Sequence, residues 1–203
     1  MSWQLVVGLT VALIPIVLAP GTSAILVAQH AATGGWRDIA SVMLGTSVGL
    51  YLHASFAALG LSALVMASAT ALTVVKVVGA AYLVGLGVHL LVTGAKAPST
   101  DRTDGTPGRA LAQAFVGNIV NPKAALVYLT LPVQFLRPGD SVTVAAFTLA
   151  TIHIVMLLPW LSLWAFVVRS TKRSQRLRST TTVIRRTGGL LLIGLGVRSA
   201  FTG

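Results

Sequence analysis

Long apolar stretches alternate with short polar links along the whole chain. A helix needs about 20 apolar residues to cross the hydrocarbon core of a bilayer, and most of the stretches reach that length. The pattern therefore predicts an all-α integral membrane protein with six transmembrane helices. The expected spans cover, approximately, residues 5–27, 39–66, 71–95, 110–135, 142–168 and 187–201.

Proline and polar residues interrupt the fourth span and also the first. Pro122 lies near the middle of the fourth span, where it removes one backbone N–H and leaves the carbonyl of Asn118 without its helical partner. Non-helical backbone at membrane depth is tolerated only where protein or a water-filled cavity surrounds it. We therefore expect this break to line a polar site inside the protein, with a simple proline kink as the alternative. Pro15 and Pro20-Gly21 interrupt the first span in the same way.

Composition supports the membrane assignment independently of these motifs. Hydrophobic residues make up 55% of the 203 residues and charged residues 9%, and the mean hydropathy is +0.85, whereas soluble proteins carry about 25% charged residues. No polar block is long enough for a separate soluble domain, so residues 1–203 are expected to form a single membrane domain. The chain has no cysteine, which excludes disulfides, thiolate catalysis and thiolate metal sites.

The net charge of +11 arises mainly from basic residues in alternate links. If the N-terminus lies outside, the links on the inner side hold 11 of the 15 Lys and Arg residues. Because basic residues favour cytoplasmic links, both termini are predicted to lie outside. The same links would contact the anionic headgroups of the lipid bilayer. No basic groove with base-stacking groups is recognisable, so nucleic acid is not an expected partner.

The two halves of the chain resemble each other. Residues 76–88 align without gaps with residues 185–197, which places the same Gly-rich signature in the third and the sixth span. Three spans per half would insert the second half upside down, giving two inverted three-helix repeats at about 1–95 and 110–203, joined by a cytoplasmic link at about 96–109. Broken helices at corresponding positions of such repeats mark a substrate site near the midplane. Chance similarity between two apolar helices is the alternative.

Several short motifs occur along the chain in a specific order. They are Pro20-Gly21, Gly45 and Gly49 followed by His53, Gly60-Leu61-Ser62-Ala63-Leu64, Lys76 with Gly79-Ala80-Ala81-Tyr82-Leu83, Asn121-Pro122-Lys123, and Leu131-Pro132-Val133-Gln134-Phe135. In this order they resemble the LysE/RhtB family of amino-acid exporters over essentially the whole chain. The resemblance implies a multi-pass exporter of the bacterial inner membrane, not an enzyme, driven by the proton-motive force. The family commonly has Pro-Gly-Pro where this chain has Pro20-Gly21-Thr22, so Thr22 supplies a hydroxyl that proline lacks.

A zwitterionic amino acid brings a carboxylate and an ammonium group that both need partners. The free N–H groups where helix halves begin after the two breaks suit the carboxylate, whereas the carbonyls before the breaks suit the ammonium group. Lys123 either pairs with the carboxylate or bonds the carbonyls freed at the break, and the sequence does not decide between these roles. The candidate substrate-binding residues are Pro20, Gly21, Thr22, Asn118, Asn121, Pro122 and Lys123.

Carboxylates are absent from the predicted spans. The chain has no glutamate, and Asp38, Asp101, Asp104 and Asp140 all lie in predicted links. A proton carrier inside the membrane must then be another group, and histidine is suited because its unperturbed pKa of about 6.5 lies near physiological pH. His53 is the first candidate because it adjoins Gly45 and Gly49, and a hydrogen-bonded packing role is the alternative. His89 and His153 rank behind it.

The same lack of acids restricts the substrate and the function class. A cationic side chain would be unpaired beside Lys123, so neutral amino acids such as threonine, homoserine or leucine are expected to be preferred over lysine and arginine. A membrane-embedded enzyme would need a catalytic set, and a metal exporter would need acidic or thiolate ligands. A channel is disfavoured because broken helices in two halves suit alternating access. No cofactor or metal is expected, and homo-oligomerisation is left open.

Overall fold

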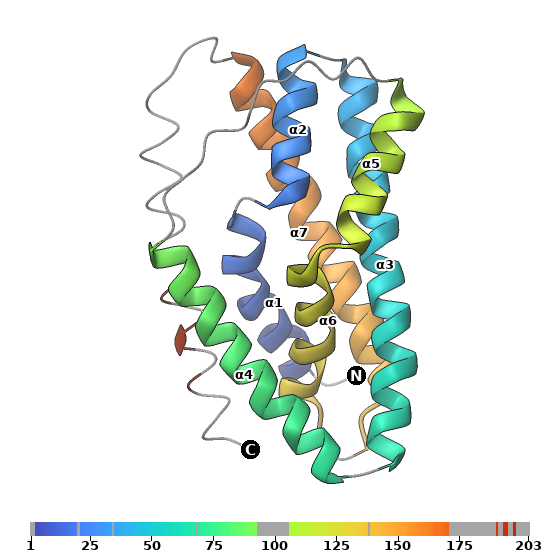
Figure 1. Ribbon diagram of the computed structural model, residues 1–203, viewed down its shortest axis with the longest axis vertical. Coiled ribbons are helices and arrows are strands. Elements are labelled where there is room, and N and C mark those ends of the chain that lie inside the picture. The colour runs from blue at the N-terminus through green and yellow to red at the C-terminus, as the bar shows by residue number, and fades with distance from the viewer. Residues whose placement is uncertain are drawn as a thin grey trace.

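The computed structural model describes residues 3–19, 21–33, 35–67, 69–92, 106–137 and 139–170, together with 190, 193, 194 and 197. In the continuous segments the fold is all-helical (Figure 1), as the apolar pattern predicts. The helices are α1 (Trp3–Leu18), α2 (Thr22–Thr33), α3 (Trp36–Ala67), α4 (Ala69–Val92), α5 (Pro107–Ile119), α6 (Pro122–Phe135) and α7 (Val142–Ser170).

The membrane-spanning elements are of two kinds. Helices α3 and α7 are long and apolar enough to cross a bilayer unbroken. Helices α1 and α2 pass the same test only as a pair, bent by 49°, and α5 and α6 form a second pair bent by 55°. Breaks in the first and the fourth predicted span are therefore confirmed. The predicted sixth span and residues 185–197 of the repeat lie largely outside the described residues, so the count of six and the inverted repeats stay predictions.

Local sequence explains where the second break lies. Helix α5 ends at Ile119, and α6 begins at Pro122, whose fixed φ and missing N–H suit the first position of a helix. Asn121 is the N-cap of α6, and its side-chain oxygen accepts a hydrogen bond from the backbone N–H of Lys123 at 3.0 Å. The Asn-Pro-Lys triplet thus ends one helix and starts the next.

The helices form a bundle in which each broken pair runs roughly end to end. Figure 1 shows α2 above α1 and α5 above α6, while α3 and α7 extend along the whole bundle and α4 crosses it obliquely. The α2–α3 link, the start of α5 and the end of α7 lie at one end of the bundle, and the α3–α4 and α6–α7 links lie at the other.

Basic residues gather at the first of these ends. Arg37 lies in the first turn of α3, Arg109 in the first turn of α5, and Arg169 in the last turn of α7. The guanidinium of Arg169 lies 5.2 Å from the ring centroid of Trp36, which shows that α7 ends beside the start of α3. Arg137, in contrast, lies in the α6–α7 link at the opposite end. The two ends of the bundle thus differ in positive charge among the described residues.

Two glycines allow α3 to pack closely against α5. A Cβ added to Gly45 would collide with the backbone carbonyl of Leu111, and one added to Gly49 would lie 2.7 Å from Oδ1 of Asn118. Both distances are shorter than a real Cβ contact permits, so only glycine allows this approach. The predicted packing role of Gly45 and Gly49 is confirmed, and it positions α3 directly beside the end of α5 at the break.

The close approach predicts that Gly45→Ala destabilises the protein. Because the obstructing atom is a backbone carbonyl, the helices must separate, and we expect the free energy of unfolding to fall by about 1–3 kcal/mol. Thermal unfolding in detergent measures the change. Gly60→Ala is the matched control, since a Cβ at Gly60 meets no atom within 4 Å. Equal unfolding midpoints for the two variants would contradict the close approach of α3 to α5.

Candidate functional site

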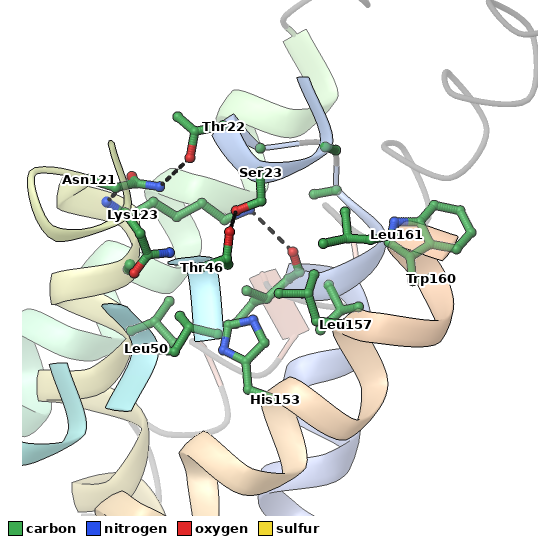
Figure 2. A pocket seen from close by; sticks show the side chains of 18 residues that line it. Thr22, Ser23, Thr46, Leu50, Asn121, Lys123, His153, Leu157, Trp160 and Leu161 are labelled. Carbon is green, nitrogen blue, oxygen red and sulfur yellow. Dashed lines mark hydrogen bonds between the residues drawn. The ribbon is translucent and has the colours of Figure 1, made fainter. Parts of the chain in front are cut away.

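A cavity of about 60 Å³ lies between the two breaks (Figure 2). A single water needs about 15 Å³ of such space, so the cavity holds several waters or the polar part of a small solute. Its polar lining consists of Thr22, Ser23, Thr46, Asn118, Asn121, Lys123 and His153. Its apolar lining includes Ile16, Val17, Leu50, Val127, Leu157, Trp160 and Leu161.

The structure brings together most of the residues that the sequence nominates for substrate binding. Gly21, Thr22, Asn118, Asn121 and Lys123 all line this cavity, although the first two and the last three lie about 100 residues apart in the chain. Pro122 begins α6, whereas Pro20 lies outside the described residues. The grouping of these residues is thus observed, and their role in binding stays a prediction.

Lys123 bonds a carbonyl that the first break sets free. Its Nζ donates to the carbonyl oxygen of Ile16 at 3.2 Å, as the dashed line in Figure 2 shows. Ile16 lies four residues before Pro20, which has no N–H to donate, so this carbonyl has no normal helical partner. Of the two roles that the sequence leaves open for Lys123, the structure therefore shows carbonyl bonding. The same side chain also lines the cavity.

His53 does the same for the carbonyl freed at the second break. Its Nε2 lies 3.0 Å from the carbonyl oxygen of Asn118, which also accepts from the N–H of Asn121 at 3.1 Å. A carbonyl oxygen can only accept, so Nε2 carries a hydrogen and donates it. Each break is thus completed from the other half of the chain, because Lys123 serves the first break and His53 serves the second.

The starts of α2 and α6 are joined across the cavity. Nδ2 of Asn121 donates to the hydroxyl of Thr22 at 3.4 Å, and the hydroxyl of Thr46 on α3 donates to that of Ser23 at 3.1 Å. The first turns of both helices line the cavity (Figure 2). Since the N-terminus of a helix carries partial positive charge and unpaired N–H groups, the two starts favour an anion between them.

Asn118 lies near the end of α5 with its side chain enclosed. The side chain is only 4% exposed, and its Oδ1 is buried without a hydrogen-bond partner in the described part of the chain. A Cβ added to Gly49 would lie 2.7 Å from this Oδ1, so the atom is packed against α3. The cavity offers Lys123 and the starts of α2 and α6 to an anionic group, and the hydroxyl oxygens of Thr22, Ser23 and Thr46 can accept from a cationic one.

A buried cluster of His53, Tyr128 and His153 adjoins the cavity. The ring of Tyr128 stacks between the two imidazoles, with centroids 5.9 Å from His53 and 6.0 Å from His153. Its hydroxyl lies 3.4 Å from Nδ1 of His153. His153 lines the cavity and His53 does not, and the proton-coupling role that the sequence suggests for His53 stays a prediction. The side chain of His89 lies outside the described residues.

Sequence inspection missed several cavity residues. Ser23, Thr46 and Trp160 line the cavity, and Tyr128 connects the histidines. Single hydroxyls in helices commonly bond their own backbone, so Ser23 and Thr46 gave no signal. Tyr128 could not be told from an ordinary core aromatic in the sequence, because the histidines that it contacts lie on two other helices.

Comparison with known proteins identifies one protein family and several membrane and efflux proteins as relatives of this chain. A family model described as LysE type translocator matches residues 14–203. The leucine efflux protein of Enterobacter sp. (strain 638) is 28% identical, over 98% of this chain and 94% of that protein. The homoserine/homoserine lactone efflux protein of Salmonella typhi is 32% identical over 60% of this chain and 59% of its own length. A membrane protein of Bacillus subtilis, YrhP, is 27% identical over 92% and 93% of the two chains. No solved structure matches.

The bond between Lys123 and Ile16 predicts a stability loss in Lys123→Met. Methionine keeps an apolar stem of similar length but removes the donor, so the free energy of unfolding should fall by about 1–3 kcal/mol. Lys123→Arg retains a cationic donor and should lose less. Thermal unfolding in detergent compares the two variants with the parent protein. A methionine variant as stable as the arginine variant would show that the carbonyl does not need this donor.

Proposed function

The chain belongs to the LysE type translocator family, and we propose that it exports neutral amino acids or their derivatives across the inner membrane in exchange for protons. The observation that carries this proposal is the polar cavity at the two breaks, lined from both halves of the chain. A solute held there would be surrounded by helix starts and freed backbone groups rather than by lipid. Transporters with broken helices bind their substrates in such places.

Both ends of an amino acid have partners in the cavity. The carboxylate lies against the starts of α2 and α6, where Lys123 supplies an opposite charge. The ammonium group donates to the hydroxyl oxygen of Thr22, which lines the cavity. The amide group of Asn121 bonds the hydroxyl of Thr22 and completes the polar lining around the substrate. Lys123, Thr22 and Asn121, which the sequence nominates for substrate binding, thus each contact a substrate group or a neighbour in the lining.

The side chain of the substrate lies against an apolar wall. Leu50, Val127, Leu157 and Leu161 line the cavity opposite the polar groups and match a small or aliphatic side chain. No Asp or Glu lines the cavity among the described residues, so a cationic side chain would stay unpaired beside Lys123. Two relatives are named for the efflux of leucine and of homoserine, amino acids with uncharged side chains. These observations support neutral substrates.

Alternating access would exploit the bonds that cross between the halves. In the present structure Lys123 bonds Ile16, and a substrate carboxylate in the cavity competes with this carbonyl for the same ammonium group. Binding would therefore loosen the link between α6 and the first break. The inverted repeats at about 1–95 and 110–203 would then move relative to each other around the bound substrate.

We place the N-terminus and the C-terminus outside the cell. The end of the bundle with Arg37, Arg109 and Arg169 is then cytoplasmic, in agreement with the preference of basic residues for that side. The α6–α7 link, which contains Arg137 and Asp140, is then outside.

Single cysteines test this orientation without interference, since the chain has none of its own. Thr106 and Ser141 are both exposed. Thr106 is the N-cap of α5 and Ser141 directly precedes α7, and these two helix starts lie at opposite ends of the bundle (Figure 1). In intact cells whose outer membrane is permeable to the reagent, a membrane-impermeant thiol reagent should label Ser141→Cys and leave Thr106→Cys unlabelled until the inner membrane is opened. Labelling of Thr106→Cys in intact cells would place the basic end outside.

Substrate charge predicts the outcome of competition in everted membrane vesicles. Uptake of labelled leucine into such vesicles corresponds to export, and unlabelled threonine and homoserine should inhibit it. Norleucine and lysine form a matched pair, since norleucine has the stem of lysine without the terminal ammonium group. Norleucine should inhibit with an affinity about tenfold or more higher than lysine, because the second cation is buried without a partner. Stronger inhibition by lysine than by norleucine would refute the preference for neutral side chains.

A further inference from the structure

Ionisable side chains near the cavity are few and can be named. Of the helices that pack against α7, α1 carries none and α2 carries only His30. Helix α3 carries Tyr51 and His53 in its middle, and Arg37 and Asp38 in its first turn, while α6 carries Lys123 and Tyr128. On α7 itself they are His153 and, in the last turn, Arg169. Among the described residues, these are the ionisable groups on α7 and on the helices packed against it that can hold a proton exchanged at the cavity.

We propose that His153 is the residue that binds the coupling proton, and that its protonation and substrate binding exclude each other. The inference rests on the proposed function and assigns its ion site. His153 is the histidine, among the described ones, that lines the cavity, and it is otherwise enclosed, with 7% of its surface exposed. In Figure 2 its ring projects from α7 toward the cavity, below the side chain of Lys123.

The other buried histidines fit this role less well. His53 donates Nε2–H to the carbonyl of Asn118 and does not line the cavity, so it is a positioning residue that completes the break and stacks on Tyr128. His30 is 1% exposed on α2 and also lies away from the cavity lining. A proton on either ring would not meet the substrate directly.

Tyr128 allows His153 to change its protonation state without losing its contact. The tyrosine hydroxyl lies 3.4 Å from Nδ1 and can donate to it or accept from it. When Nδ1–H donates to the hydroxyl oxygen, the proton from cavity water adds to Nε2, and release returns it to water from the same atom. The contact with Tyr128 therefore holds the ring in place and leaves one nitrogen for exchange.

Protonation of His153 and substrate binding oppose each other because both depend on the solvation of the cavity. Lys123 and His153 line the same cavity, and no carboxylate among the described residues lines it. An imidazolium there depends on cavity water for solvation, and a space of about 60 Å³ holds only a few waters. A substrate with no net charge displaces this water, so desolvation favours loss of the proton. By linkage, the proton weakens substrate binding by the same factor, which is the property that exchange requires.

Proteoliposomes containing the purified full-length protein separate coupling from transport. His153→Gln keeps a polar side chain that can bond Tyr128 but cannot hold a proton at physiological pH. Leucine accumulation driven by a pH gradient should fall by about tenfold or more in this variant, while leucine–leucine counterflow at equal pH stays measurable. His30→Gln is the matched control, and it should behave as the parent protein in both assays. His53→Gln, which keeps a donor for Asn118, should retain its response to the pH gradient.

Proton release gives a second measurement that needs no variant to fold. Saturating leucine added to the parent protein in weakly buffered detergent solution should release protons, because leucine binding displaces the proton held at His153. A parent protein that transports leucine but releases no proton overturns the inference. A full response of His153→Gln to the pH gradient also overturns the inference, and so does loss of that response in His53→Gln alone. If the parent protein shows no counterflow of any neutral amino acid, the proposed function itself fails.

Discussion

Backbone carbonyls freed inside a membrane must find new partners, because lipid offers none. Pro20 and Pro122, the prolines at the two breaks, each remove an N–H inside a span, and the carbonyls affected are those of Ile16 and Asn118. Lys123 bonds the first and His53 bonds the second. The donors come from the half of the chain opposite to each break, so satisfying the backbone also ties the two halves together.

The cavity exists because of these breaks. A continuous helix at either position would direct its backbone groups along its own axis, and neither helix starts nor carbonyls would face a solute. The breaks instead expose the first turns of α2 and α6 beside Lys123 and Asn118. Close packing of Gly49 on α3 against Asn118 holds the second break in position. A cavity with a cation, helix starts and hydroxyl groups in its lining suits a zwitterion.

Much of this arrangement can be predicted from the sequence, because its causes are local. Hydropathy fixes the spans, proline chemistry fixes the breaks, and the spacing of Gly45 and Gly49 marks the face of α3 that packs on α5. The donors to the freed carbonyls could not be predicted, since Lys123 lies 107 residues from Ile16 and His53 lies 65 residues from Asn118. Nor could the sequence show that His153 rather than His53 lines the cavity, since that depends on how α7 packs against α6. The sixth span and the inverted repeat rest on residues 171–203, most of which the structure does not describe.

Amino-acid release from living cells decides whether the residues at the breaks form an export site. Cells that lack this protein, cells that express it, and cells that express Asn121→Ala at equal membrane abundance can be fed dipeptides that raise internal leucine and threonine. Asn121 caps α6 and bonds Thr22 across the cavity, so the alanine variant should insert normally and lose export. The parent protein should therefore raise leucine and threonine in the medium, and Asn121→Ala should match cells without the protein. Equal release by the parent protein and Asn121→Ala would show that the substrate does not bind at the second break.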